Sequence, residues 1–148
     1  GKIGVMAEIN FEKNETANKS EFVEFTKNLA MHIAATDARF LGADEIDEDF
    51  KAREAAVYET QLKEQGKPEK MIAGIIQGKL KKLASEVCLL EQKFVMDPDF
   101  TITTLAEKIG KEIGDKLTIT KFSKITLGEG IEKKEDNLAD EVAKMTKQ

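Results

Sequence analysis

One long helical stretch with a single break, residues 46–90, constrains this chain more than any other feature. The break reads Gln65-Gly66-Lys67-Pro68. Glycine is common just past a helix end, and proline is common at the first helical position. Apolar residues recur at helical spacing on both sides of the break: Phe50, Val57, Tyr58 and Leu62 before it, and Met71, Ile72, Ile75, Ile76, Leu80, Leu83 and Val87 after it. This pattern predicts two amphipathic helices that fold back antiparallel around Gly66 to Pro68.

The second helix of this predicted hairpin carries more apolar residues than one partner helix would cover. Its stripe therefore also fits a second subunit or another element of the same chain. Gly74 and Gly78 lie inside the helix, where each glycine costs about 1 kcal/mol relative to alanine. Two glycines on one face favour close approach by another backbone, with an exposed face that tolerates glycine as the alternative.

Length and composition favour one domain over residues 1–148, with residues 46–90 as an inserted hairpin and residues 136–148 as a carboxy-terminal helical module. Hydrophobic residues make up 41% and charged residues 34% of the chain, which is typical of a soluble protein rich in exposed helix. The net charge of −5 argues against nucleic acid or an anionic membrane as the main partner. No apolar run is long enough to span a membrane, so we expect no membrane partner.

The single cysteine, Cys88, excludes an intrachain disulfide and favours a reducing compartment, so we expect a cytoplasmic protein. The chain begins at Gly1 rather than at methionine, and we expect it to be a piece of a longer protein.

Two segments show the pattern of β-strands. In residues 2–10, apolar residues alternate with polar ones. Residues 117–127 are rich in threonine and β-branched residues, but Phe122 falls out of phase with the other apolar positions. Either a bulge near Lys121 restores the phase, or Phe122 covers the other face of the sheet. We predict that the two segments pair in one antiparallel sheet, because neither would be stable alone.

Two further helices are predicted from capping residues and spacing. The first is capped by Asn18 or Ser20 and runs to Ala35, whereas the second follows Thr101 and ends at Gly114. Their predicted inward faces comprise Phe22, Phe25, Leu29, His32 and Ile33, and then Ile102, Leu105, Ile109 and Ile113.

A last helix is predicted from Asp136 or Asn137 onward. Residues 11–17 have the composition of a loop, and residues 88–96 are apolar and predicted to be extended. Leu138, Val142 and Met145 share one face of this last helix. The fold class is therefore α+β: a small antiparallel β-sheet packed with helices, with a projecting antiparallel helical hairpin.

Motifs for chemistry are mostly absent. The acidic run at residues 44–49 lacks the glycine and the alternating oxygen ligands of a calcium loop, and a solvated helix start explains it better. No phosphate-binding glycine loop is present. Cys88 is best explained as a buried, inert thiol, and one histidine cannot form a His-based metal cluster. We expect no cofactor, no metal and no enzymatic activity.

His32 lies at the edge of the apolar stripe of its helix. Spacing alone is equally compatible with a partly buried histidine bonded to backbone and with a functional side chain. We predict that His32 is at least partly accessible to solvent in the free protein.

Four segments together resemble the elongation factor Ts family, the guanine-nucleotide exchange factors of elongation factor Tu. They read Leu-Ala-Met-His-Ile-Ala-Ala at 29–35, Gly-Lys-Pro-Glu-Lys at 66–70, Glu-Val-Cys-Leu-Leu-Glu-Gln-Lys-Phe-Val-Met-Asp-Pro at 86–98 and Gly-Glu-Gly-Ile-Glu-Lys at 128–133. Their order and spacing carry the resemblance, which runs over the whole chain. It covers the carboxy-terminal portion of the family's architecture: the second core subdomain, the helical hairpin and the terminal helix.

The resemblance implies a binding partner, elongation factor Tu, and an exchange mechanism by thermodynamic linkage without any bond made or broken. It implies that the turn around Met31, His32 and Ala35 grips the GTPase, with Thr36 and Phe40 beside it. It also implies that the terminal helix reaches the nucleotide-binding domain through Leu138, Val142 and Met145. The hairpin of some family members serves in dimerisation, so a homodimer is a further expectation.

The family's Thr-Asp-Phe-Val motif follows the equivalent strand of the first subdomain and disturbs the magnesium and nucleotide site. After the strand in this chain stand residues 10–16, which lack that motif. We therefore predict that this chain binds elongation factor Tu but accelerates GDP release poorly. The rival hypothesis is a helical-hairpin dimerisation module with no GTPase partner, which would not need the histidine turn.

Overall fold

The computed structural model describes residues 2–127, so the predicted last helix with Leu138, Val142 and Met145 lies outside the described residues. The α+β class is confirmed. The helices are α1 (Ser20–Ala35), α2 (Glu48–Glu64), α3 (Glu69–Val87) and α4 (Ile102–Ile113), with short 3-10 turns η1 (Asn14–Asn18), η2 (Ala43–Glu45) and η3 (Leu89–Glu91). The strands are β1 (Ile3–Asn10), β2 (Lys93–Phe94), β3 (Asp97–Thr101) and β4 (Thr118–Thr126).

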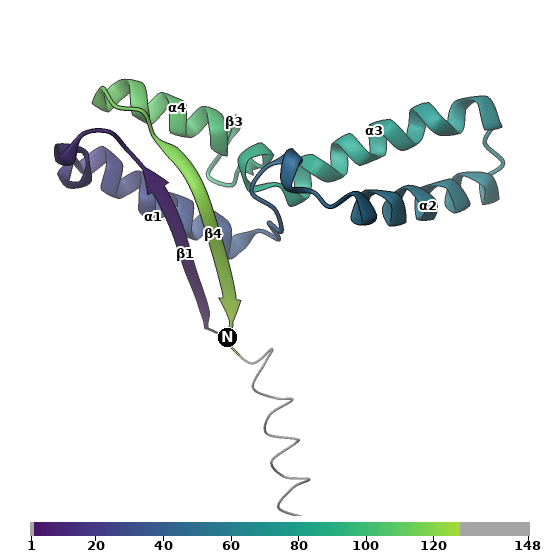
Figure 1. Cartoon of the computed structure of the whole chain (residues 1–148), viewed down its shortest axis with the longest axis horizontal. Helices are drawn as coiled ribbons and strands as arrows, with labels where there is room; N and C mark the ends of the chain where they lie inside the picture. The colour runs from purple at the N-terminus through teal and green to yellow at the C-terminus, as the bar shows by residue number, and fades with distance from the viewer. Residues whose placement is uncertain (1, 128–148) are drawn as a thin grey trace, which may run out of the picture.

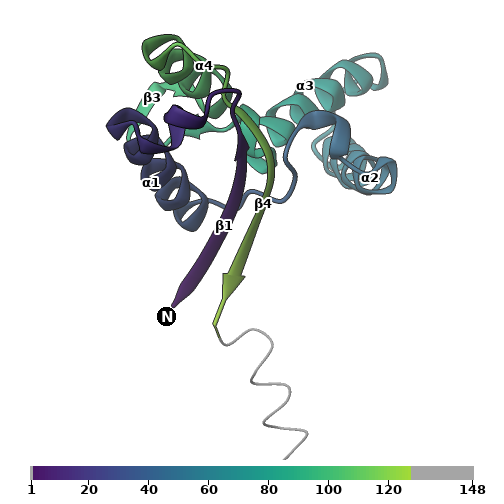
Figure 2. The same cartoon turned by 60° about the vertical axis from the view of Figure 1, so that its left-hand side comes forward.

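The core lies where α1 and α4 pack against the β1–β4 ribbon. Figure 1 shows these elements gathered at one end of the molecule, with the α2–α3 hairpin reaching away from them. In Figure 2 the ribbon runs between α1 on one side and the hairpin on the other, and the end where β1 begins extends beyond the helices. The buried residues of this cluster are Phe22, Phe25, Leu29, Ile33, Leu89, Phe94, Ile102, Leu105, Ala106, Ile113, Leu117 and Ile119.

The predicted pairing of the two terminal strands is confirmed, because β1 and β4 form an antiparallel ribbon. The predicted bulge is also confirmed: Glu8 pairs with Lys121 while Ile9 pairs with Ile119, so Thr120 is the extra residue. Beyond the bulge the phase reverses. Phe122 therefore packs on the core, whereas Ile125 is 68% exposed on the outer face.

The hairpin turns where the sequence predicts. Gly66 adopts a left-handed conformation with φ +70°. Its N–H donates to the Lys63 carbonyl, and the Lys67 N–H donates to the Leu62 carbonyl, both at 3.0 Å. These two bonds form a Schellman motif, in which only glycine fits the left-handed position without strain. Pro68 lies one residue earlier than predicted, at the N-cap of α3 rather than at its first helical position.

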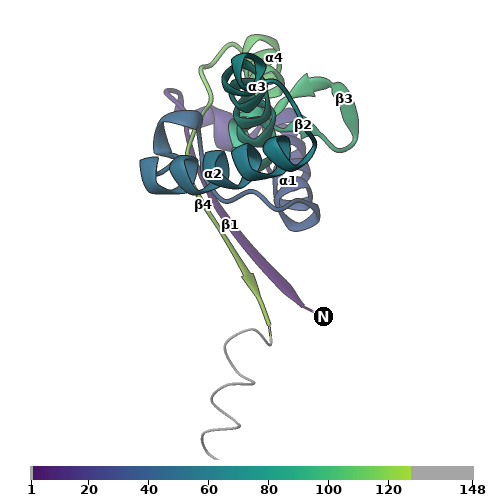
Figure 3. The same cartoon turned by 90° about the vertical axis from the view of Figure 1, so that its right-hand side faces the viewer.

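The outward reach of the hairpin leaves much of its apolar stripe half-buried. Figure 3 views the hairpin from its far end, with α2 and α3 side by side and the core behind them. Val57 and Met71, which the spacing places in the stripe, are 50% and 57% exposed. The predicted close approach at Gly74 and Gly78 is wrong: among the described residues nothing lies within 4 Å of a Cβ built at either position. The alternative, an exposed face that tolerates glycine, is what the structure has.

The two ends of the hairpin meet at its base. The Arg39 and Phe40 N–H groups donate to the Val87 carbonyl at 2.8 and 3.0 Å, and the Leu89 N–H donates to the Phe40 carbonyl at 2.8 Å. Phe40 and Cys88 form an isolated parallel bridge. The chain therefore leaves and re-enters the core through two adjacent extended segments.

The start of α1 differs from the prediction. Lys19 occupies the N-cap, and neither Asn18 nor Ser20 caps the helix with its side chain. Residues 14–18 form the 3-10 turn η1 in place of the predicted loop, because Thr16 is fully buried and donates from its hydroxyl to Asp115. A local capping rule cannot detect this long-range anchor.

Asp115 ties the segment after β1 to the turn between α4 and β4. Its carboxylate accepts from the Glu12 N–H at 3.1 Å, the Lys13 N–H at 3.0 Å and the Thr16 hydroxyl at 2.5 Å. The Thr16 hydrogen bond, helped by these backbone donors, lowers the pKa of the Asp115 carboxyl to about 2.

Residues 88–101 contain a second small sheet that the sequence did not reveal. Residues 88–96 were predicted to be extended, and the structure instead forms η3 and β2 there, with the antiparallel partner β3 directly after them. The following helix is confirmed at both ends. Thr101 and Thr104 form a capping box, and Gly114 closes α4 with φ +70°. Within residues 2–127, none of the helices combines the length and apolar character needed to cross a membrane.

Candidate partner-binding surface

His32 lies in the last turn of α1 and is completely buried. The prediction that it is partly accessible is therefore wrong. Its partners come from the turn between β2 and β3 and from the residue after η3, about 60 positions further along the chain. Spacing on one helix could not show that these segments fold over it.

Both nitrogens of the His32 ring are hydrogen-bonded. The Val95 N–H donates to Nδ1 at 3.2 Å, so Nδ1 carries no proton. Nε2 must then carry the proton, and it donates to Oε1 of Gln92 at 2.8 Å. The alternative weighed from the sequence, a histidine bonded to backbone, is confirmed at Nδ1. The ring is neutral and has one fixed tautomer.

Burial lowers the pKa of His32, and the hydrogen bond to Gln92 opposes this effect. Protonation would place a second N–H at Nδ1, directly against the donor N–H of Val95. The site therefore requires the neutral imidazole.

Thr36 and Gln92 complete the hydrogen-bond network around the ring. The Thr36 hydroxyl lies 2.9 Å from the carbonyl of His32 and 3.2 Å from Oε1 of Gln92. Gln92 is buried, and its amide nitrogen donates to the Glu86 carbonyl in the last turn of α3 at 2.6 Å. This network joins the end of α1 to the end of α3.

Exposed apolar side chains lie around this buried network. Met31 precedes His32 on α1 and is 51% exposed, and Ala35 is exposed one turn later. Val95, whose backbone contacts the His32 ring, is 46% exposed, and Met96 beside it is 62% exposed. We call these four residues the docking surface.

Val95 and Met96 were missed from the sequence as site residues. They belong to the segment at 86–98 that carries the family resemblance, but they were assigned to an extended apolar stretch. No local signal marks the turn that exposes them, since Asp97-Pro98 directly after them lies inside β3. Val95 and Met96 are exposed because they form the turn between β2 and β3.

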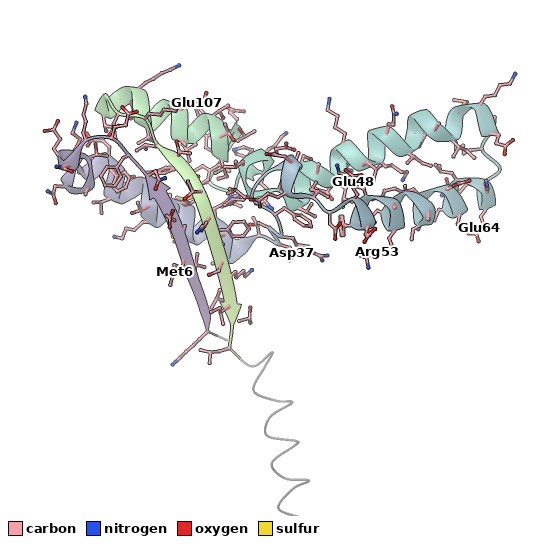
Figure 4. All side chains as sticks on the ribbon, viewed as in Figure 1. Met6, Asp37, Glu48, Arg53, Glu64 and Glu107 are labelled. Carbon is pink, nitrogen blue, oxygen red and sulfur yellow. The ribbon has the colours of Figure 1, made fainter. Side chains whose placement is uncertain are left out.

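Phe40, also predicted to bind the partner, lies at the base of the hairpin. It is half-buried and packs edge-to-face on Phe50, with ring centroids 5.5 Å apart. Thr36 is half-buried beside His32. Figure 4 shows Asp37 directly after this turn, at the junction between α1 and the hairpin. The structure therefore places Phe40 with the hairpin base and the other described predicted residues around His32.

Within the part of the chain that the structure describes, the other two candidate sites, Cys88 and the acidic run, have structural roles. Cys88 is completely buried, as predicted, and desolvation raises the pKa of its thiol to about 11. The acidic run opens α2 as predicted, because the Asp47 side chain accepts from the Asp49 N–H and caps the helix. Between residues 2 and 127, no group of three or more His, Cys, Asp or Glu side chains is placed to hold a metal ion.

Comparison with known proteins agrees with the resemblance. Residues 1–129 match the family described as Elongation factor TS. The chain is 44% identical over 147 residues to the elongation factor Ts of Syntrophotalea carbinolica, and 46% identical over 145 residues to that of Alkaliphilus metalliredigens. These matches cover 99% and 97% of this chain but 48% and 67% of the two relatives. The chain spans about half to two thirds of the length of such relatives, and it belongs to the elongation factor Ts family.

Proposed function

We propose that this chain supplies the partner-binding part of an elongation factor Ts-type exchange factor and binds elongation factor Tu. The observation that carries the proposal is the docking surface, which presents Met31, Val95 and Met96 to solvent above a fully hydrogen-bonded buried network. Exposed apolar side chains on a rigid support are typical of binding hot spots. Such a factor acts on a translation GTPase, and we expect it to work in the cytoplasm.

The proposed roles of the predicted residues follow from where they lie. Met31 and Ala35 contact the GTPase directly, together with Val95 and Met96. His32 and Thr36 support this surface from below, and Phe40 stabilises the hairpin base. The resemblance assigns contact with the nucleotide-binding domain to Leu138, Val142 and Met145.

The proposed activity is linkage between two binding equilibria and needs no covalent chemistry. An exchange protein binds the nucleotide-free GTPase more tightly than the GDP-bound form. By thermodynamic linkage, it lowers the affinity of the GTPase for GDP by the same ratio. This chain lacks the Asp-Phe pair after β1, and the segment there is used structurally: the Glu12 and Lys13 N–H groups are bound to Asp115. A partner that binds the GDP-bound and the nucleotide-free GTPase equally tightly does not change the affinity for GDP. We therefore expect exchange by this chain alone to be weak.

The test compares two methionines that are about equally exposed on helices. Met31 on α1 is 51% exposed in the docking surface, and Met71 on α3 is 57% exposed near the hairpin tip. Met31→Ala is expected to weaken binding of nucleotide-free elongation factor Tu about tenfold, whereas Met71→Ala leaves it unchanged. Titration calorimetry gives both affinities. Equal affinities for wild type and Met31→Ala would contradict the proposed surface.

The second measurement is release of a fluorescent GDP analogue from elongation factor Tu. Saturating amounts of this chain are compared with a full-length exchange factor. We expect binding with a small acceleration of release. Release as fast as with the full-length factor would show that the exchange machinery lies within this chain.

A second candidate function is self-association through the hairpin. Val57 and Met71 leave apolar area exposed on α2 and α3, and the hairpin serves in dimerisation in some family members. Sedimentation equilibrium over a range of concentrations, with Val57→Glu as the variant, tests this candidate. A monomer at all concentrations would reject it without affecting the GTPase-binding proposal.

A further inference from the structure

Gln92 contacts more elements of the fold than the sequence suggests for one polar residue. Its backbone carbonyl accepts from the Ile102 N–H at the start of α4 at 3.1 Å, and its N–H lies 3.0 Å from the Cys88 carbonyl. Its side chain accepts from His32 on α1 and donates to the Glu86 carbonyl on α3. One residue, only 6% exposed, therefore joins α1, α3 and α4.

The side-chain amide of Gln92 cannot be replaced by a simpler group. Its oxygen must accept the Nε2 proton of His32, while its nitrogen must donate to the Glu86 carbonyl. An apolar side chain would leave both buried partners unsatisfied, and a carboxylate could not donate to the carbonyl. The amide thereby fixes the His32 ring, and the ring holds the Val95 N–H in place.

A groove of about 480 Å³ marks the junction of these elements. It is lined by residues from the end of α1, the end of α3 and the segment around Gln92, including Thr36, Glu86 and Gln92 itself. The hydrogen bonds of the Gln92 side chain join the ends of α1 and α3 beside this groove. The docking surface lies on α1 and on the turn between β2 and β3, which directly follows the Gln92 segment.

We infer that Gln92 is a positioning residue for partner binding, which holds the two halves of the docking surface in register and links them to the hairpin base. Met31 and Ala35 belong to α1, whereas Val95 and Met96 belong to the β2–β3 turn. The path between the halves runs from Gln92 through the His32 ring to Val95. Preorganisation of this kind raises affinity without any contact between Gln92 and the partner. The inference rests on the proposed function.

The main test is a double-mutant cycle on binding to nucleotide-free elongation factor Tu, with the whole chain. Gln92→Met removes both side-chain hydrogen bonds at similar volume, and we expect about a tenfold weaker affinity. His32→Ala should weaken binding to a similar extent. Because both act through one path, the double variant should be no more than about twofold weaker than the weaker single variant. If the two losses of affinity instead multiply in the double variant, the inference is overturned.

Two controls separate positioning from general loss of stability. Gln77→Met makes the same substitution at an exposed position on α3 and should leave affinity unchanged. Ile72→Ala removes buried area near the hairpin tip, far from the docking surface, and should lower stability without weakening binding. If Ile72→Ala weakens binding as much as Gln92→Met does, the effect is one of stability and the inference fails.

A local readout that does not need the partner is hydrogen exchange of the Val95 amide. Its protection should fall at least about tenfold in Gln92→Met and stay unchanged in Gln77→Met. If Gln92→Met does not fold, Gln92→Asn keeps the amide but is one methylene too short to reach both partners. It should show a smaller loss of the same two signals, and wild-type values in both would overturn the inference.

Failure of this inference differs from failure of the proposed function. No binding by the wild-type chain would reject the proposed function, and this inference with it. Tight binding by the wild type with equal affinity in Gln92→Met would reject the inference alone.

Discussion

The core and the hairpin are built from helices of comparable length, yet they bury their apolar residues to different depths. Five residues are buried in α1 and five in α4, against one in α2 and two in α3. A core helix meets a second helix and a sheet, whereas each hairpin helix meets mainly its antiparallel neighbour (Figure 1). An apolar stripe in a sequence therefore predicts which face packs but not how deeply it is buried.

Local interactions within its own helices also stabilise the hairpin. Asp47 caps α2, and Gly66 closes it with a Schellman motif. The ion pair between Lys63 and Glu59, at 2.6 Å and one helical turn apart, adds a small contribution. Such local interactions form independently of the core, so we expect the hairpin to open separately from it.

The largest expected effect is in the core. Leu29→Ala should lower the free energy of unfolding by about 3 kcal/mol, because Leu29 is 1% exposed and its truncation would leave a cavity in the core. Val23→Ala on the exposed side of the same helix should change it by less than about 0.5 kcal/mol. Urea denaturation of both variants measures the difference. A similar loss in both would contradict the assigned core.

A smaller effect is expected in the hairpin. Leu62→Ala should cost about 2 kcal/mol, since Leu62 is buried but has only the facing helix to cover it. Native-state hydrogen exchange should show lower protection across α2 and α3, with the most protected amides of α1 and α4 unchanged. Equal loss of protection in α1 would mean that hairpin and core open as one unit.

Two glycines of the hairpin should respond with opposite signs. Gly66→Ala forces a Cβ into the left-handed region and should cost about 1 kcal/mol. Gly78→Ala lies in an exposed helical position with open space around it, and should stabilise by about 0.8 kcal/mol. Thermal unfolding of both variants is the measurement. A loss at Gly78 would indicate that another molecule approaches that face.

The smallest expected effect is a change in the stability of the core near neutral pH, and it comes from His32. Its pKa is lowered in the folded state, so the unfolded chain binds this proton more readily as the pH falls below the ordinary value of 6.5. Stability is therefore complete above this pH and decreases below it. Denaturation series between pH 8 and pH 5, for wild type and His32→Gln, should show the slope in wild type only.

A separate loss at lower pH belongs to Asp115 and serves as an internal reference. Its folded-state pKa of about 2 lies below the ordinary 3.8, so its contribution is present above pH 3.8 and is lost as the pH falls toward 2. Asp115→Asn should remove this second step and keep the first. Loss of the first step in that variant would contradict the assignment to His32.

The sequence predicted features that depend on neighbouring residues. The turn at Gly66, the cap at Thr101 and the end of α4 at Gly114 are each determined by a few adjacent positions, and all three are confirmed. The bulge at Thr120 was also accessible, because the phase of apolar residues changes across it. The fold class followed from these elements.

Features that depend on distant partners were not accessible. His32 is buried by segments about 60 residues away, and residues 14–18 form a turn because Asp115 binds Thr16 from the other end of the described chain. The exposed pair Val95 and Met96 became recognisable only when β2 and β3 were seen to form a tight hairpin. In the candidate site, the sequence pointed to the segment around His32 but could not show that His32 itself is buried.

The bridge between Phe40 and Cys88 has a consequence for how this architecture tolerates change in length. The chain leaves the core at Phe40 and returns at Cys88, and these two residues lie side by side. The length of the hairpin between them therefore does not change how the chain is attached to the core. The entropy of closing a loop grows only slowly with its length. Whole helical turns could be added to or removed from both arms together, down to a short connection, and the core would keep the same two attachment points.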